Sequence, residues 1–414
     1  MKSPLARGTL RTSIVLGARL TIQAGILLLV TRLLGPRDYG AFAGITALAM
    51  MLGTLATFGT HIVLLGEISK NPARRAYILP FAVTTTLLSG SFLLVLYSLI
   101  GPIVLGKYHL DPGARCAIGI AELLAIPLLT ITSAEHQGHG RIALSQILLS
   151  LPLALRLVAV FAIFVSHAQS PAAAYAYGYL ATAVLALIAA IFSLRDAWPP
   201  ISSWRVPNLS ELKHSAGYAV LNITAAGPTE LDKALAPRLL LPATASMYSA
   251  AARVIGSLTV PVIAMMLTVM PRLFREGQLN APRTQRLLVQ LLAAALGYGL
   301  LLDVALWLAA PMFDWLFGSN YAGMQHTIRW LCLAVPGMSL RIALGTILMS
   351  LQHPWLRAAF EITGLVTLFV AATVLASRYG LTGMALALAC SEWVMAILGS
   401  FILARIRQSP LASS

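Results

Sequence analysis

The sequence predicts an all-α protein that crosses a membrane many times. Of the 414 residues, 58% are hydrophobic and only 10% are charged, and the mean hydropathy is +0.82. One or two soluble domains cannot bury this much apolar surface. Residues 77–106 and 171–194 contain no Asp, Glu, Lys or Arg. Such runs are long enough for transmembrane helices and too continuous for the alternating strands of a membrane β-barrel.

We predict about twelve transmembrane helices, separated by short segments rich in turn-forming residues. The predicted spans are residues 11–33, 39–66, 77–101, 114–134, 142–166, 171–194, 215–239, 244–271, 286–310, 324–350, 356–377 and 381–404. The longest connection, 195–214, joins the sixth span to the seventh. We therefore expect an N-terminal six-helix lobe (1–194), a cytoplasmic linker (195–214) and a C-terminal six-helix lobe (215–414).

A short internal match supports two related halves. Residues 31–44 align without a gap to residues 237–250, with a pair of leucines in each and Pro36 matched to Pro242. The shift of 206 positions is close to half of the chain length. The match therefore indicates an internal duplication of the whole chain.

The basic residues indicate the orientation of the chain, because cytoplasmic loops retain Lys and Arg. One set of alternate connections, together with both termini, contains 17 of them, and the opposite side contains 6. We therefore expect both termini in the cytoplasm and two parallel halves related by a pseudo-two-fold axis along the membrane normal. The net charge of +15 follows from this bias and does not indicate binding to nucleic acid.

Six basic residues fall inside the predicted spans: Arg19, Arg156, Lys233, Arg253, Arg329 and Arg341. Each would cost about 2.5 to 3.5 kcal/mol if it faced lipid at the centre of the bilayer. We therefore expect them to face protein or a water-filled cavity. Guanidinium groups bind phosphate through two parallel hydrogen bonds and stay charged, so a cavity rich in arginine predicts a cargo that carries phosphate.

The alternative is that these cations form structural ion pairs with acids inside the spans: Glu122, Glu230, Asp232, Asp303, Glu361 and Glu392. For Lys233 an ion pair is favoured, because Glu230 lies one helical turn before it and Asp232 is adjacent. Arg329 lies near the end of its span and can reach the membrane surface. No acid lies nearby on the same helix face for Arg19, Arg156, Arg253 and Arg341. For these four, lining a substrate path and forming a structural ion pair are equally compatible with the sequence.

The intramembrane acids allow a second role. Asp303 and Glu392, with Glu122, are candidates for carrying a coupling proton or sodium ion, and neutralisation of the arginines is the competing interpretation. His136 and His139 flank Gly138, but no third ligand is nearby, so we predict no metal site. The sequence has no nucleotide-binding loop, metalloprotease motif or nucleophile elbow. We expect no cofactor and no enzymatic activity.

Four stretches carry a resemblance to a known family. They are Arg-Leu-Leu-Gly-Pro-Arg-Asp-Tyr-Gly-Ala-Phe (32–42), Glu-Leu-Asp-Lys (230–233), and the segments 247–253 and 270–273. Together with the length and the number of spans, they resemble the Wzx-type polysaccharide flippases of the multidrug/oligosaccharidyl-lipid/polysaccharide exporter superfamily. The second copy departs from the first, because Leu241 stands where the first copy has Gly35.

The resemblance implies two six-helix lobes in a V around a central cationic cavity, lined by the first, second, seventh and eighth spans. This placement favours Arg19, Asp232, Lys233 and Arg253 as cavity residues. It also implies that the protein moves an oligosaccharide linked to undecaprenyl pyrophosphate across the bacterial inner membrane to the periplasmic leaflet. Polymerase and chain-length proteins of the same pathway are expected partners. Two alternatives are a cation-coupled multidrug exporter and a membrane-embedded polymerase or ligase of lipid-linked glycans.

Overall fold

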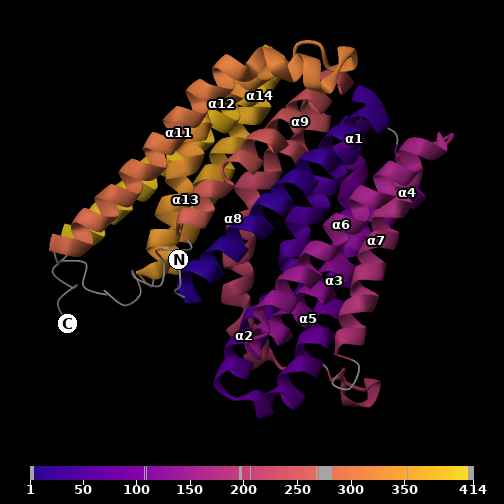
Figure 1. The fold of residues 1–414 in the computed structure, drawn as a ribbon, viewed down its shortest axis with the longest axis vertical. Helices are drawn as coiled ribbons and strands as arrows, with labels where there is room; N and C mark the ends of the chain where they lie inside the picture. The colour runs from indigo at the N-terminus through magenta and orange to yellow at the C-terminus, as the bar shows by residue number, and fades with distance from the viewer. Residues whose placement is uncertain are drawn as a thin grey trace. The chain divides into compact units, whose positions relative to one another are not determined.

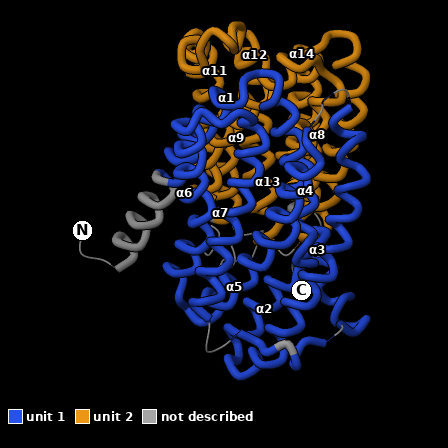
Figure 2. The backbone as a smooth tube through the Cα atoms, turned by 90° about the vertical axis from the view of Figure 1, so that its right-hand side faces the viewer, with its two compact units in different colours: residues 1–222 blue, residues 223–414 orange. Residues whose placement is uncertain are grey.

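The computed structural model describes residues 4–106, 108, 110–194, 198–205, 207–266, 269, 282–351 and 353–408. Within these ranges all regular structure is helical. The described residues form two compact units, 1–222 and 223–414, which Figure 2 colours separately. The boundary between them lies inside helix α8 (Leu209–Leu239) and not in the predicted linker.

Unit 1 consists of helices that run along the chain in the order shown in Figure 1. They are α1 (Pro4–Ala56), α2 (Thr60–Lys70), the short helix η1 (Pro72–Arg74), α3 (Arg75–Leu105), α4 (Pro112–Ile120), the π-helical turn η2 (Ala121–Ala125), α5 (Ile126–Gly138), α6 (Ile142–Ser166), α7 (Pro171–Ser193), the short helix η3 (Ile201–Ser203) and the first part of α8. Prolines at the first turns of α4 and α7 fit helix starts, where the missing N–H is not needed.

Among the described residues, unit 2 continues with the second part of α8 and six further helical segments. They are α9 (Pro242–Leu258), α11 (Pro282–Phe317), the short helix η4 (Ser319–Tyr321), α12 (Met324–Cys332), α13 (Val335–Ser350) and α14 (Pro354–Gln408). A core of buried aliphatic side chains, including Leu288, Ala295 and Leu344, joins α11, α13 and α14. The predicted eighth span, 244–271, ends in residues outside the described ranges.

Each predicted span lies at least partly on described helix, and two helices, α1 and α14, each contain residues of two predicted spans. Helix α1 is broken by a kink at Gly35, whose φ is 68°, and α14 is broken by a kink at Gly380, whose φ is 56°. These kinks lie between the predicted spans 11–33 and 39–66, and between 356–377 and 381–404. Glycine adopts positive φ without steric cost, so it permits a sharp break between two apolar helices.

The predicted second span, 39–66, is not one helix. It is interrupted between α1 and α2, where Phe58 and Gly59 both have positive φ, 48° and 75°. A Cβ atom on Gly59 would lie 2.5 Å from the carbonyl oxygen of Ser215. The backbone of α8 therefore approaches this break so closely that only glycine fits at position 59. The start of α8 packs against the rest of unit 1 at this break.

Eight helices among the described residues are long and apolar enough to cross a membrane, or nine if the bent pair α12 and α13 counts as one span. The two parts of this pair differ in direction by 46°. Helix α8, which contains the predicted seventh span and carries Glu230, Asp232 and Lys233, is not among them. The chain is thus a multi-pass membrane protein, and α8 is a charged helix beside apolar ones.

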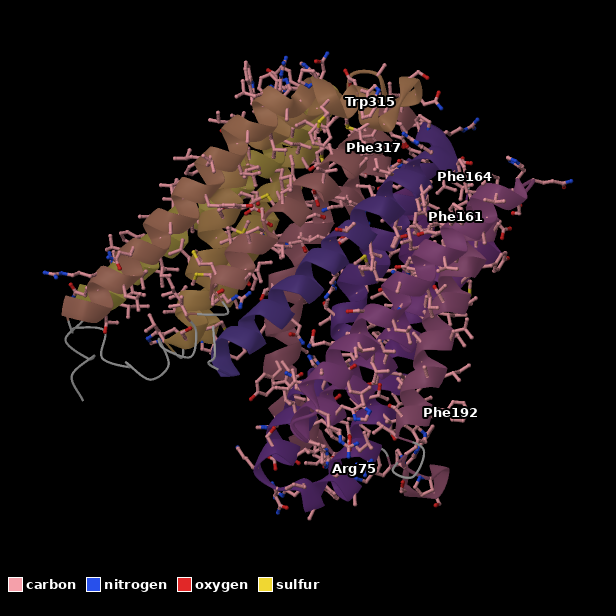
Figure 3. All side chains as sticks on the ribbon, viewed as in Figure 1. Arg75, Phe161, Phe164, Phe192, Trp315 and Phe317 are labelled. Atoms are coloured by element: carbon pink, nitrogen blue, oxygen red, sulfur yellow. The ribbon has the colours of Figure 1, made fainter. Side chains whose placement is uncertain are left out.

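The apolar helices expose large hydrophobic side chains, as expected for surfaces that face lipid. Phe161 of α6 is 59% exposed, Phe192 of α7 is 68% exposed and Trp315 of α11 is 81% exposed. In Figure 3, Phe161 and Phe164 lie near one end of unit 1, and Arg75 and Phe192 lie near the other. Trp315 and Phe317 lie near the end of α11 in unit 2 (Figure 3).

Candidate functional site

In unit 1, Arg156 of α6 is held by two side chains from other elements. Its Nη2 lies 3.1 Å from Oε1 of Glu122, and its guanidinium carbon lies 3.4 Å from the centre of the Tyr179 ring. The Tyr179 hydroxyl donates a hydrogen bond to the same carboxylate oxygen. The side chains of Arg156 and Glu122 are only 13% and 8% exposed. The cluster is therefore a nearly buried ion pair with a tyrosine donor.

Local structure explains the position of this cluster. Glu122 lies on η2, a single π-helical turn, and such turns are often found at functional sites. Tyr179 lies on α7 and packs edge-on against Tyr175, with ring centres 6.3 Å apart. Phe42 of α1 packs on Tyr175 at 5.0 Å. The aromatic rings exclude water around the pair, so its electrostatic attraction is stronger than it would be at the surface.

In unit 2, a second buried cluster lies on α8 and α9. Nζ of Lys233 lies 3.0 Å from Oδ1 of Asp232 and also donates to the carbonyl oxygen of Thr229. The hydroxyl of Tyr248 donates to Oδ2 of Asp232 at 2.9 Å. Of the two acids expected beside Lys233, the structure pairs it with Asp232. Glu230 is half-buried, and its Oε2 has no hydrogen-bond partner among the described residues.

A third cluster joins α13 and α14. Nε of Arg341 donates to Oε2 of Glu392 at 2.7 Å, with side chains only 4% and 0% exposed. On the same helix as Glu392, Arg357 donates to Glu361 at 3.0 Å. Nη2 of Arg341, Oε1 of Glu392 and Oε2 of Glu361 are buried and lack hydrogen-bond partners within the described structure. The cluster thus retains unused hydrogen-bonding capacity.

The remaining cations inside spans lie in more open surroundings. Arg19 of α1 is exposed. Arg253 of α9 is half-buried and has an interaction with another group, while Ala250, Ala251 and Ala252 just before it are buried. In an otherwise apolar span, an accessible guanidinium requires water or an anionic partner.

Arg329 and Asp303 lie together in a pocket of about 560 Å³ between α11 and α12. Trp307, His326, Trp330 and three apolar residues, Val304, Leu308 and Leu333, complete its lining. The guanidinium carbon of Arg329 lies 4.9 Å from the ring centre of Trp307. Asp303 forms no ion pair with Arg329 among the described residues. The structure thus separates these two candidates from the three ion-paired clusters.

Sequence reasoning missed the tyrosines and tryptophans at these sites. Tyr179 and Tyr248 are isolated aromatic residues in apolar helices, so nothing in the local sequence distinguishes them. The pocket residues have a signal: Met324, Ile328 and Leu331 are buried at helical spacing. Their spacing leaves His326, Arg329 and Trp330 on the opposite face. Separately, no group of three possible metal ligands occurs among the searched residues, which are those that the structure describes.

The connection before α8 also contains an ion pair. Arg205 donates to both carboxylate oxygens of Glu211, at 2.6 and 2.9 Å, and its guanidinium carbon lies 4.2 Å from the ring centre of Tyr77. The hydroxyl of Tyr77 donates to Glu211 at 3.0 Å. The hydrogen bonds from Arg205 lower the pKa of Glu211 from 4.5 to about 2. These contacts tie the start of α8 to α3 of unit 1.

Comparison with solved structures shows which fold these clusters occupy. An inward-facing multidrug resistance MATE family transporter of the MOP superfamily aligns with a TM-score of 0.76 and 14% identity, covering 94% of this chain and 96% of that one. The lipid II flippase MurJ in an inward closed conformation aligns with a TM-score of 0.72 and 13% identity, covering 94% of this chain and 87% of that one. A MOP superfamily transporter from Pyrococcus furiosus aligns with a TM-score of 0.68 and 15% identity, covering 97% and 95%. The chain therefore has the MOP transporter fold.

Sequence comparison identifies the family within this fold. No curated protein matches the chain. The family described as "Polysaccharide biosynthesis protein" matches residues 5–276. This range includes the stretches 32–42 and 230–233 that carry the resemblance, which the match confirms. Since the match covers more than half of the sequence, the chain belongs to the polysaccharide biosynthesis protein family.

Proposed function

We propose that this protein is a flippase that moves an oligosaccharide linked to undecaprenyl pyrophosphate from the cytoplasmic to the periplasmic leaflet of the bacterial inner membrane by alternating access. The observation that carries the proposal is the family match over residues 5–276, on a chain with the MOP transporter fold. The MurJ neighbour, a lipid II flippase by its title, supports a lipid-linked cargo. The bias of 17 to 6 basic residues supports cytoplasmic termini.

The first cargo contacts in this proposal are Arg19 and Arg253. Both lie on helices apolar enough to span the membrane, and neither is fully buried. A pyrophosphate carries several negative oxygens that a guanidinium can bind in pairs. Each guanidinium would be able to hold phosphate of the head group while the lipid tail stays in the bilayer.

Arg156, Arg341 and Lys233 are neutralised by Glu122, Glu392 and Asp232 in the structure. Each would contact cargo only by exchanging its carboxylate for a phosphate. We propose that this exchange couples transport to a proton. A proton taken up at the unpartnered Oε1 of Glu392 would neutralise the acid and release Arg341 to bind phosphate. Glu122 would release Arg156 in the same way.

The test uses a strain that lacks the gene and receives variants in its place. Loss of the protein should abolish the surface polysaccharide and leave its lipid-linked repeat unit in the cytoplasmic leaflet. Arg253→Ala should not restore the polysaccharide at normal protein level, and Arg253→Lys should restore part of it. Arg378→Ala is the matched control, because Arg378 is an exposed arginine of the same unit. Full restoration by Arg253→Ala would contradict the assignment of Arg253 to the cargo.

The alternatives give different results in the same strain. A cation-coupled drug exporter would change susceptibility to a panel of cationic drugs and leave the polysaccharide intact. A polymerase or ligase would leave single repeat units in the periplasmic leaflet, because they cross the membrane and are not extended. If the protein is a flippase, its expected partners are the polymerase and chain-length proteins that receive the flipped repeat unit.

A further inference from the structure

The pocket between α11 and α12 has an architecture that the transport proposal does not use. Its volume, about 560 Å³, falls within the range of small-molecule sites, roughly 300 to 1,000 Å³. Helix α12 buries Met324, Ile328 and Leu331 against its own unit, and its opposite face lines the pocket. The backbone N–H of Gln325 donates to Asp314 of α11 at 3.0 Å, which fixes the two helices near the end of the pocket.

The rim of the pocket belongs to a surface that faces acyl chains. Val304, Leu308 and Leu333 line it and are 58%, 67% and 44% exposed. The first two lie in Thr284–Phe317, a helix that is apolar enough to cross a membrane and has only 22% of its most apolar window buried. Side chains of this kind are covered by lipid in a membrane. A ligand of this pocket must therefore bring hydrocarbon as well as a polar part.

The polar part is defined by an anion and a cation that do not neutralise each other. Asp303 supplies acceptor oxygens, and Arg329 supplies guanidinium donors, with its Nε buried and lacking a hydrogen-bond partner in the described structure. His326 accepts a hydrogen bond from Nε1 of Trp330 through its Nε2, at 3.1 Å. In a neutral ring the proton is then on Nδ1, which adds a donor.

The two indole rings complete the site. Trp307 already carries Arg329 on its face and is 52% exposed, so part of its ring remains open. An indole face attracts an ammonium group as well as a guanidinium. Together the lining offers an acceptor and an aromatic face for a cation, donors for an anion, and an apolar rim.

We propose that this pocket binds the head group of a zwitterionic aminophospholipid, phosphatidylethanolamine. Its ammonium group would donate to Asp303, its phosphate would accept from Arg329 and His326, and its acyl chains would lie along Val304 and Leu308. The inference is independent of the cargo, because the pocket lies within unit 2 and shares no residue with the three ion-paired clusters.

Other ligands fit the lining less well. Phosphatidylglycerol, which is anionic and has no ammonium group, would place no cation at Asp303, and repulsion by that carboxylate would weaken its binding. Phosphatidylcholine has a quaternary ammonium group without N–H donors, so it would contact the indoles but not donate to Asp303. A free sugar or phosphate would leave the exposed apolar rim without cover.

The experiment is native mass spectrometry of the full chain in detergent, titrated with phosphatidylethanolamine, phosphatidylcholine or phosphatidylglycerol of identical acyl chains. We expect phosphatidylethanolamine to bind about tenfold more tightly than the other two. Asp303→Asn should remove the preference for phosphatidylethanolamine over phosphatidylglycerol. Arg329→Gln should weaken the binding of both of these lipids. Trp307→Leu should weaken the binding of phosphatidylethanolamine. Trp315→Leu, a matched change on α11 outside the pocket, should leave its binding unchanged.

Two lipid-binding results would overturn the proposal. One is equal binding of the three lipids by the parent protein. The other is an unchanged preference in Asp303→Asn, a nearly isosteric variant whose folding is checked by an unchanged elution profile. If Arg329→Gln does not fold, Asp303→Asn and Trp307→Leu still decide the outcome. Retention of a soluble oligosaccharide, and of no lipid, by the parent would also contradict the assignment.

Discussion

The carboxylate of Glu392 accepts a hydrogen bond from Arg341 at 2.7 Å while both side chains are almost fully buried. Taking two charges out of water is costly, and their attraction offsets this cost only while both are present. The same holds for Glu122 and Arg156 in unit 1, where Tyr179 donates a further hydrogen bond. At the residue scale, the intramembrane charges are therefore stable as pairs.

Removing one member of a pair should be worse than removing both. We expect Arg341→Leu to lower the free energy of unfolding by about 3–5 kcal/mol, because it leaves a buried, uncompensated carboxylate. Arg341→Leu combined with Glu392→Leu should recover most of this loss. Thermal unfolding in detergent, followed by tryptophan fluorescence, measures the effect. If the double variant is as unstable as the single one, the buried charge is not the cause.

The sequence predicts which charges lie inside spans but not their partners. The spacing of Asp232 and Lys233 places them together, whereas Arg156 and Glu122 are 34 positions apart and Arg341 and Glu392 are 51 apart. Ion-pair partners on different helices depend on how the helices pack, and the sequence of a single helix carries no information about that packing. The separate pocket of Asp303 and Arg329 was missed for the same reason, since it requires α11 and α12 to lie side by side.

At the scale of elements, breaks between helices depend on particular backbone positions. The matched segments 31–44 and 237–250 both contain a helix boundary followed by proline. Gly35 has a φ of 68°, whereas Leu241 has a φ of −70° and lies in an extended conformation. The sequence difference at this position therefore corresponds to two different turns. The additional break at Gly59 was not predicted, because its cause is the approach of α8.

The break at Gly59 gives a clear comparison between two glycines. Gly59→Ala should destabilise the protein by about 1–3 kcal/mol, because φ is 75° and the new Cβ would overlap the Ser215 carbonyl oxygen. Gly66→Ala is the control: it lies within α2 with nothing within 4 Å of the new atom, and alanine favours helix by about 0.5–1 kcal/mol. Unfolding midpoints of the two variants measure the difference. Equal midpoints would show that the close approach of α8 is not needed.

The connection to α8 should respond to acid. The pKa of Glu211 is lowered to about 2 by Arg205, so its contribution to stability is complete above its ordinary value of 4.5 and is lost as the pH falls toward 2. We expect the unfolding midpoint of the parent to fall toward that of Glu211→Gln over this interval. The control is Glu67→Gln, which removes the acid of a more exposed ion pair with Arg74. A constant difference between parent and Glu211→Gln from pH 5 to 2 would contradict this account.

At the scale of the whole molecule, the described residues form two compact units, and the three ion-paired clusters described above lie one in unit 1 and two in unit 2. The fold class and the family followed from apolar runs and short motifs, because these are properties of local sequence. The energy source belongs to the proposal: among the coupling candidates Asp303, Glu122 and Glu392, we propose that the ion-paired carboxylates of Glu122 and Glu392 accept the proton.

The proposed coupling to a proton predicts that the transport rate depends on the proton gradient across the membrane. Glu392→Gln imitates the protonated acid, so it should keep Arg341 available and make transport less sensitive to the proton gradient. The measurement is the transport rate in energised and de-energised vesicles for the parent and for Glu392→Gln. Equal rates for the parent in both conditions would remove proton and sodium coupling and the membrane potential as driving forces.

The most direct test of the central claim is reconstitution of the purified chain into vesicles that contain a labelled undecaprenyl-pyrophosphate oligosaccharide. Accessibility of the label to an added reagent measures its movement between leaflets. The account predicts that the label crosses unchanged, at a rate reduced to that of protein-free vesicles by Arg253→Ala and unaffected by Arg378→Ala. No movement above the protein-free rate, or recovery of an extended glycan, would contradict the claim that the protein is a flippase.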